Sequence, residues 1–210
     1  MWGLFDENIT KNSIIILLKK SGGMTIEELS KLVEITPMGI RQHLISLEKK
    51  GVVTYTAKRQ GIGRPGFIYK LTEVADTLFP KSYDNFAVET LKDIEKNEGR
   101  SKIDEIFGWR SKRTLRTRKE VLREKKSIAE LVNGLKEILQ SEGYLVELEI
   151  IDGSYHLKLY NCPINKIAFE YDEACKHEIQ MFKDLLGCDM QRLKSITDGG
   201  QACIYVIPAD

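Results

Sequence analysis

Two helix-start signals in the first quarter of the chain constrain its fold more than any other feature. Residues 25–28, Thr-Ile-Glu-Glu, form a capping box, in which the threonine caps a helix and the second glutamate reaches back to it. Thr36 followed by Pro37 predicts another helix start, because the N–H that proline lacks has no partner at the first helical position. Gly51 is expected to end that helix. An apolar stretch over residues 10–20 predicts a helix before both, so we expect three short helices joined by tight turns.

The last of these helices, residues 37–50, combines an apolar stripe with a polar outer face. Ile40, Leu44 and Leu47 fall at i, i+4 and i+7, which predicts that they face a core. This layout is typical of a helix-turn-helix that reads DNA, and equally of an ordinary three-helix bundle with a solvated face. In the first alternative, the residues expected at the DNA groove are Thr36, Arg41, Gln42 and Ser46.

The segment that follows favours the DNA-reading alternative. Residues 52–56 and 67–71 are rich in β-branched and aromatic residues, and the string AKRQGIGRPG joins them. Lys58, Arg59 and Arg64 lie among the glycines of this predicted hairpin tip. Glycines allow a close approach to a phosphate backbone, and cations displace its counterions. A merely solvated loop does not explain three cations at the tip, so we predict a winged helix-turn-helix that binds double-stranded DNA.

Charge is distributed unevenly along the 210 residues. Residues 1–126 hold 25 Lys and Arg against 17 Asp and Glu, whereas residues 127–210 hold 7 against 14. Only the first part is therefore suited to a polyanion. We predict an α+β protein of three segments: a winged-helix domain over 1–85, a helical connector or dimerisation region over 86–126, and a small cysteine-containing sensor domain over 127–210.

The connector includes a basic tract over residues 100–126, with 11 Lys and Arg against 4 acids. Its apolar residues have the spacing of a helix with one buried edge. Three interpretations remain open for the tract: an extra phosphate-contacting surface, a dimer-forming connector, and a solvated interdomain helix.

Composition also indicates the cellular setting and the function class. The longest apolar run is five residues, whereas a membrane-spanning helix needs about 20. The N-terminus does not have the pattern of a secretory signal, so we expect a cytoplasmic protein without a membrane partner. Thiols stay reduced there, and cysteine clusters more often indicate a metal than a disulfide. No CxxC pair, nucleotide loop or Ser/His/Asp arrangement supports an enzyme.

Two strings and four late cysteines carry a resemblance to a known family. The strings are TPMGIRQHLISLEKKGVV and GIGRPGFIYKLTEVADTLFPKSY. Together with the cysteines they resemble the winged-helix repressors of the Suf iron–sulfur assembly operon, which belong to the DeoR/ArsR-like regulators. The resemblance covers residues 10–85 and, by pattern, 140–205. It implies a homodimer whose C-terminal domain carries an iron–sulfur cluster, of the 4Fe-4S or 2Fe-2S type, and whose cluster-bound form binds the operator tightly.

The four cysteines follow the spacing C-x12-C-x12-C-x14-C and do not all have the same structural setting. Cys175 and Cys188 lie at opposite ends of a predicted helix, which separates them by roughly 16–20 Å at about 1.5 Å per residue. Cys162 follows a predicted hairpin, Cys175 starts the helix and Cys203 starts the last strand, so these three can converge. We therefore predict Cys162, Cys175 and Cys203 as ligands of a metal or cluster, with Cys188 as a weaker fourth.

The residues themselves leave the nature of the ligand open. Zinc competes with an iron–sulfur cluster, because cysteine thiolates bind both, and buried cysteines without any metal are a further alternative. Only the family resemblance favours iron–sulfur. The expected function is that of a DNA-binding transcriptional repressor controlled by an iron–sulfur cluster, with a winged-helix regulator that senses zinc, another metal or a small molecule as the alternative.

Overall fold

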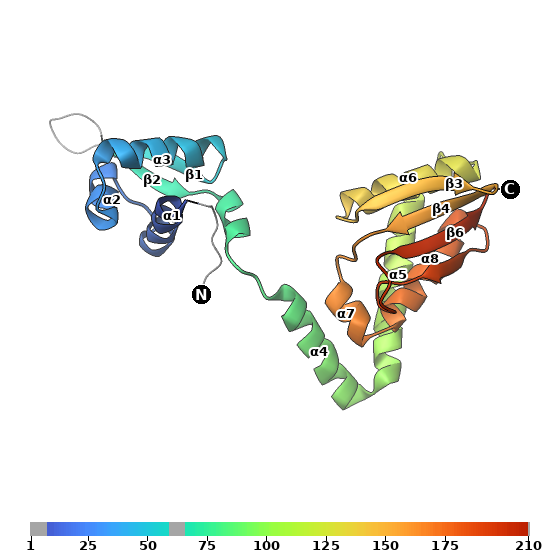
Figure 1. Ribbon diagram of the computed structural model, residues 1–210. Coiled ribbons are helices and arrows are strands. Elements are labelled where there is room, and N and C mark those ends of the chain that lie inside the picture. Colours follow the sequence, from blue (N-terminus) through green and yellow to red (C-terminus); the bar gives the residue numbers. More distant parts are fainter. Residues whose placement is uncertain (1–7, 59–65, 210) are drawn as a thin grey trace. The chain divides into compact units, whose positions relative to one another are not determined.

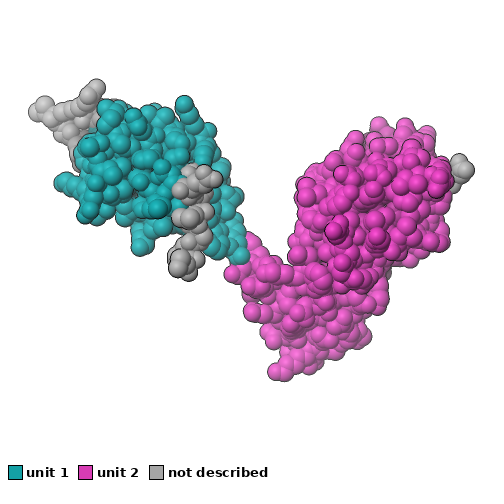
Figure 2. Space-filling view, viewed as in Figure 1, with its two compact units in different colours: residues 1–81 teal, residues 82–210 magenta. Residues whose placement is uncertain are grey.

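The computed structural model describes residues 8–58 and 66–209, and it divides into two compact units (Figures 1 and 2). Unit 1 comprises residues 1–81 and unit 2 comprises residues 82–210. We expected residues 86–126 to form a connector of its own. The segment is helical, and its helices pack against later elements of unit 2.

Unit 1 begins with three helices, α1 (Ile9–Ser21), α2 (Ile26–Val33) and α3 (Pro37–Lys49). The capping box is confirmed: Thr25 Oγ1 accepts from the N–H of Glu28 at 3.2 Å, and the Glu28 carboxylate accepts from the N–H of Thr25 at 2.7 Å. Thr36 caps α3, with its hydroxyl oxygen accepting from the N–H of Gly39 at 3.2 Å, and Pro37 is the first helical residue. These local signals determine where α2 and α3 begin, as the sequence predicts.

An antiparallel hairpin of β1 (Val53–Lys58) and β2 (Gly66–Leu71) follows, and then a short 3-10 helix, η1 (Glu73–Leu78). An isolated bridge between Met24 and Tyr69 attaches the start of α2 to the hairpin. The predicted stripe of Ile40, Leu44 and Leu47 is buried. The remaining core of unit 1 comes from α1, α2, β1 and η1, with Ile14, Ile15, Leu18, Ile26, Leu29, Val52, Val53 and Ala75.

Unit 2 combines five helices with a four-stranded antiparallel sheet within its described residues. The helices are α4 (Tyr83–Glu98), α5 (Arg100–Val121), α6 (Ile128–Ser141), α7 (Asn165–Glu170) and α8 (Glu173–Leu186). The strands are β3 (Val146–Ile151), β4 (Ser154–Leu159), β5 (Gln191–Lys194) and β6 (Cys203–Pro208), in the order β3-β4-β6-β5. The sequence predicted β3, β4 and β6 but not β5, whose four residues alternate too briefly to be distinguished from a loop.

The core of unit 2 lies between the sheet and helices α6 and α8 (Figure 1). Alternate residues of β4 and β6 are buried, among them Leu157 and Tyr205, and Phe182 of α8 packs edge-on against Tyr205 with ring centroids 5.4 Å apart. A second cluster joins α4 and α5 to α7 and α8 through Ile103, Phe107, Tyr171 and Ala174.

The corner between α4 and α5 is fixed by a charged contact. Gly99 has a φ of 85°, which a residue with a side chain rarely adopts, and the chain turns there. Arg100 then donates from Nε to Glu173 at 2.5 Å and packs its guanidinium over the ring of Tyr171. No helix among residues 8–58 and 66–209 has both the length and the apolar character to cross a membrane.

We expect two adjacent residues of α3 to contribute very differently to the stability of unit 1, because one is buried and the other is exposed. Leu44 is 1% exposed and Ile45 is 47% exposed. Leu44→Ala should lower the free energy of unfolding by about 2–5 kcal/mol because it leaves a cavity. Ile45→Ala should change the same quantity by less than about 0.5 kcal/mol. Urea unfolding of the full chain, followed by circular dichroism, measures both. Equal losses from the two variants would show that α3 presents a different face to the core.

Candidate functional sites: the outer face of α3 and a thiol cluster

The outer face of α3 carries the residues predicted to read DNA. Arg41 and Gln42 are exposed and Ser46 is half-buried, whereas the Thr36 hydroxyl oxygen is engaged at the helix cap. A cation and an amide on the outer face of a helix-turn-helix suit hydrogen bonds to base edges in the major groove. All four predicted residues therefore belong to α3: three lie along the helix, and Thr36 is the cap at its start.

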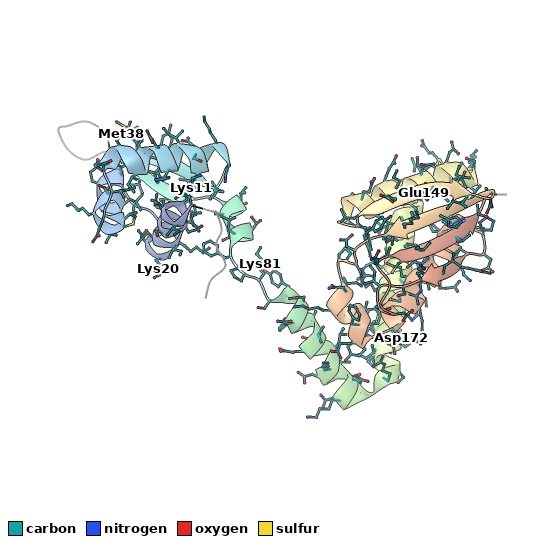
Figure 3. All side chains as sticks on the ribbon, in the orientation of Figure 1. Lys11, Lys20, Met38, Lys81, Glu149 and Asp172 are labelled. Carbon is teal, nitrogen blue, oxygen red and sulfur yellow. The ribbon has the colours of Figure 1, made fainter. Side chains whose placement is uncertain are left out.

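Two apolar residues on the same face were not predicted. Met38, whose side chain is labelled on α3 in Figure 3, is 64% exposed. Ile45 is 47% exposed, and neither residue belongs to the buried stripe of this helix. Exposed apolar groups beside Arg41 and Gln42 can contact the methyl group of thymine. The signal was present in the sequence, because each of these residues falls outside the i, i+4, i+7 stripe.

The predicted wing corresponds to the hairpin of β1 and β2, which follows α3. Its base is stiffened by aromatic contacts: the rings of Tyr55 and Phe67 lie 5.0 Å apart and those of Tyr55 and Tyr69 5.6 Å apart. Lys58 is the last residue of β1 and pairs with Gly66, and its side chain is not described. Arg59 and Arg64 lie outside the described residues. Their predicted contacts with phosphates stay a prediction.

Three of the four cysteines come from segments that meet in unit 2. Cys162 follows β4 by three residues, Cys175 lies in the first turn of α8, and Cys203 is the first residue of β6. Cys203 pairs in register with Leu159, near the end of β4 that leads to Cys162. The thiols of Cys162, Cys175 and Cys203 are close enough to influence one another electrostatically.

The surroundings of these thiols favour their protonated form. Burial is the main cause that raises the pKa of Cys162 to about 11, and the carboxylate of Glu178 and the other two thiols add to the shift. Burial also raises the pKa of Cys175, with Glu178 as the next cause. A thiol must lose its proton to bind a metal. Metal binding at these residues would therefore release protons.

Glu178 lies at the centre of this cluster. One oxygen of its carboxylate accepts from the hydroxyl of Tyr144 at 3.0 Å, and the other accepts from the hydroxyl of Tyr205 at 3.1 Å. Burial raises the pKa of Glu178, while the two tyrosine hydroxyls and the nearby Arg118 and Arg110 lower it. The sequence did not indicate this residue, because a single glutamate within a helix resembles any solvated one.

Arg192, on the unpredicted strand β5, supplies a positive charge to the thiols. It pairs in register with Tyr205, and its guanidinium lowers the pKa of Cys175 through charge and a hydrogen bond. One of its terminal nitrogens, Nη1, is buried and has no hydrogen-bond partner among the described residues. A buried, unsatisfied cationic nitrogen beside a thiol suits an anionic group bound at that thiol.

Cys188 and His177 are engaged elsewhere. Helix α8 runs unbroken from Glu173 to Leu186, so Cys175 and Cys188 lie at its opposite ends. The residue whose charge affects the pKa of Cys188 is Asp189, not one of the other thiols. Nε2 of His177 lies 2.9 Å from Asp104 Oδ1 on α5. Both observations agree with a cluster of three thiols rather than four.

The three thiols do not form a ready metal site. Within residues 8–58 and 66–209, no three His, Cys, Asp or Glu side chains are close enough together to hold a metal ion. Binding would require the thiols to turn toward one another. Cys203 starts from a restrained position, because its sulfur accepts from the N–H of Ile196 at 3.4 Å.

Comparison with known families assigns the first of these two sites. The family described as "Winged helix-turn-helix DNA-binding" matches residues 7–54, which include all three helices of unit 1. Residues 7–54 are a winged helix-turn-helix DNA-binding domain. The match gives this part of the chain a DNA-binding function of the winged-helix type. A search of curated proteins finds no match to the sequence.

Several solved structures are similar to the chain at low sequence identity. A possible transcriptional regulator from Methanosarcina mazei is 12% identical over 45% of this chain and 82% of its own, with a TM-score of 0.32. A MarR family regulator from Neisseria meningitidis is 14% identical over 57% of this chain and 81% of its own, with a TM-score of 0.31. PadR from Bacillus subtilis, in complex with operator DNA, is 16% identical over 87% of this chain and 96% of its own, with a TM-score of 0.31. At these TM-scores none of the three assigns a ligand or a partner to this chain.

We expect substitutions on α3 and on the wing to have different effects on DNA binding. Arg41→Ala should cost about 1–3 kcal/mol of binding free energy and relax sequence preference, because it removes a contact to a base edge. Arg64→Ala should weaken binding to all sequences and flatten its salt dependence, because it removes a phosphate contact. Binding titrations at several salt concentrations, on the preferred duplex and on scrambled ones, distinguish the two effects. Lys96→Ala, an exposed cation of α4 in unit 2, is the control and should change neither.

Proposed function

We propose that the protein is a transcriptional repressor whose operator binding is controlled by an iron–sulfur cluster held by Cys162, Cys175 and Cys203. The observation that carries this proposal is the grouping of the thiols. Three cysteines from distant segments influence one another electrostatically, whereas Cys188 does not take part. The same three cysteines follow from the sequence pattern, and the family resemblance supplies the cluster.

The groups around the three thiols fit an anionic cluster. Thiolate sulfur is the ligand that iron–sulfur clusters take from proteins. Arg192 would balance part of the negative charge with its unsatisfied Nη1, and Arg110 and Arg118 lie close enough to affect the carboxylate of Glu178. A cluster bound by three cysteines has one iron whose remaining ligand is not a cysteine, which makes the cluster easier to lose.

The positions of the three ligands explain how loss of the cluster would change the fold of unit 2. The ligands belong to the end of β4, the start of α8 and the start of β6, so binding fixes three elements relative to one another. When a site does not exist in the disordered state, its binding free energy contributes to folding. Without the cluster, Cys162 and Cys175 carry protons, because burial raises the pKa of both thiols. The guanidinium of Arg192 then has only Tyr205 and the thiols of Cys175 and Cys203 beside it.

We expect serine substitutions to separate the three ligands from Cys188. Cys162→Ser, Cys175→Ser and Cys203→Ser should each abolish the broad visible absorbance of anaerobically purified protein and, with it, the tight binding of operator DNA. Cys188→Ser is the matched control and should retain most of both. Absorbance spectra, iron and sulfide content, and operator titrations measure these effects for each variant.

Other outcomes of the same experiment contradict the proposal. A colourless wild-type protein that contains one zinc per chain would instead support a zinc-sensing regulator. Loss of the cluster only in Cys188→Ser would mean that α8 breaks before Leu186. In either case, DNA binding through α3 would still stand.

The proposal includes a homodimer, because a single winged helix covers only half of a two-fold symmetric operator. Leu91 and Ile94 of α4, which we expected at the dimer contact, pack within unit 2 instead. Phe86 on α4 and Phe169 on α7 are 69% and 59% exposed. A hollow of about 370 Å³ between α4 and α7 is lined by Asn85, Val88, Glu89, Lys92, Lys166, Phe169 and Glu170. The two exposed rings and this hollow, whose lining is mostly polar, form a patch that is our candidate for the dimer contact.

We expect a charge at this patch to separate the dimer. Sedimentation at micromolar concentration should give twice the monomer mass for the wild type and the monomer mass for Phe86→Asp, because the substitution buries an unpaired carboxylate in the contact. Leu145→Asp is the control, since Leu145 is 65% exposed and belongs to neither α4 nor α7. A wild-type monomer, with and without cluster, would rule out the dimer.

A further inference from the structure

Helix α5 presents an exposed row of cations that the winged helix and the thiol cluster do not use. Lys112, Arg116 and Lys119 follow one another at i, i+4 and i+7, which places them on one face of the helix, and Arg113 stands beside them. All four are exposed. We call these four residues the cationic stripe.

The opposite face of α5 is anchored in unit 2, so the stripe cannot turn inward. Ile103, Phe107 and Leu122 are buried. Arg118 is also buried, and it donates to the carboxylate of Glu142 at 2.6 Å. The helix is therefore held by one face while the stripe faces away from the core.

Acidic side chains near the stripe are occupied by other cations. Glu120 accepts from Arg123 at 3.2 Å, and Glu105 accepts from Lys102 at 2.5 Å. Within residues 8–58 and 66–209, no ion pair involves any of the four residues of the stripe. The stripe thus has positive charge that unit 2 does not neutralise, although residues 127–210 as a whole carry 14 acids against 7 cations.

The shape and chemistry of this surface favour a phosphate backbone over a protein. An open hollow of about 390 Å³ is lined by Lys112, Leu115, Arg116, Lys119 and Glu120, so Leu115 is its one apolar residue. Protein interfaces have apolar centres from which charged residues are depleted. Contacts with DNA phosphates are made by rows of Lys and Arg. The winged helix of the same chain already holds DNA, which raises the local concentration of phosphates around unit 2.

We propose that the cationic stripe of α5 is a second DNA-contacting surface, which binds phosphates of a duplex and does not read sequence. The stripe adds to affinity and to its salt dependence, whereas the outer face of α3 determines which sequence is bound. The proposal does not depend on the iron–sulfur cluster.

The test compares two triple variants of the full chain on one probe, a random-sequence duplex longer than the footprint of two winged helices. The stripe variant carries Lys112→Gln, Arg116→Gln and Lys119→Gln. The control variant carries Lys96→Gln, Lys176→Gln and Lys194→Gln, which remove three exposed cations from α4, α8 and β5 of the same unit. Both variants lose the same net charge, and thermal unfolding checks that both remain folded.

In the stripe variant, the slope of log affinity against log salt should become shallower by about 2 to 3 between roughly 50 and 200 mM salt, since each phosphate contact contributes about 0.9. The control variant should keep the wild-type slope. An unchanged slope in the stripe variant overturns the proposal and leaves an acidic protein surface as the partner class. An equal decrease of the slope in both variants overturns the proposal too, because it would show an effect of net charge and not of this face of α5. Failure of the cysteine variants to alter DNA binding would refute the cluster and leave this result unaffected.

Discussion

The packing of α8 on the central strand β6 is the contact on which the cysteine-containing half of the protein depends. Phe182 and Tyr205 meet edge-to-face in the core, and such aromatic pairs contribute about 0.5–1.5 kcal/mol beyond the burial of their area. One turn earlier on the helix, Glu178 accepts from the hydroxyl of the same Tyr205. A further turn back is Cys175, and two residues before Tyr205 is Cys203. The helix register that buries Phe182 therefore also brings two of the three thiols toward each other.

The same contact explains why an acidic residue is retained in this core. An enclosed carboxylate is costly unless its oxygens are hydrogen-bonded. Tyr144 and Tyr205 supply one donor to each oxygen of Glu178, and Arg118 and Arg110 add positive charge nearby. The hydrogen bonds of the Glu178 carboxylate are satisfied, whereas Nη1 of Arg192 and Nε of Arg118 are buried and have no partner among the described residues. The imbalance at Arg192 lies beside Cys175, where a bound anion would remove it.

Local signals predicted the elements of both units, because each depends on neighbours in sequence. The predicted capping box at Thr25 forms, and a second one, of the same Ser/Thr-x-x-Glu pattern, forms at Ser127. The hairpin expected before Cys162 turns at Asp152 and Gly153, which have the positive φ values of 49° and 74° that a tight hairpin needs. The grouping of Cys162, Cys175 and Cys203 could be anticipated for a similar reason. A helix has a fixed rise per residue, and that rise alone separates Cys188 from Cys175.

Features that depend on contacts between distant segments could not be predicted in this way. Strand β5 exists because β6 offers it an edge, and its four residues have little pattern of their own. Arg192 and Glu178 acquire their roles only when β5 and α8 meet the same tyrosine. The packing of the predicted helical connector could not be foreseen for the same reason, since Ile103 and Phe107 find their partners in Tyr171 and Ala174, more than sixty residues later.

Helix α5 links the thiol cluster to the DNA-binding half through the chain itself. Ser111 donates to the carbonyl oxygen of His177 at 3.1 Å, and Asp104 lies 2.9 Å from the ring of the same histidine. His177 is two residues beyond Cys175 on α8, so a displacement at the start of α8 acts directly on α5. The other end of α5 turns at Gly99 into α4, which begins one residue after the boundary between the units. In the proposed cluster-controlled repressor, this sequence of contacts is the path within unit 2 that leads from Cys175 to the start of α4.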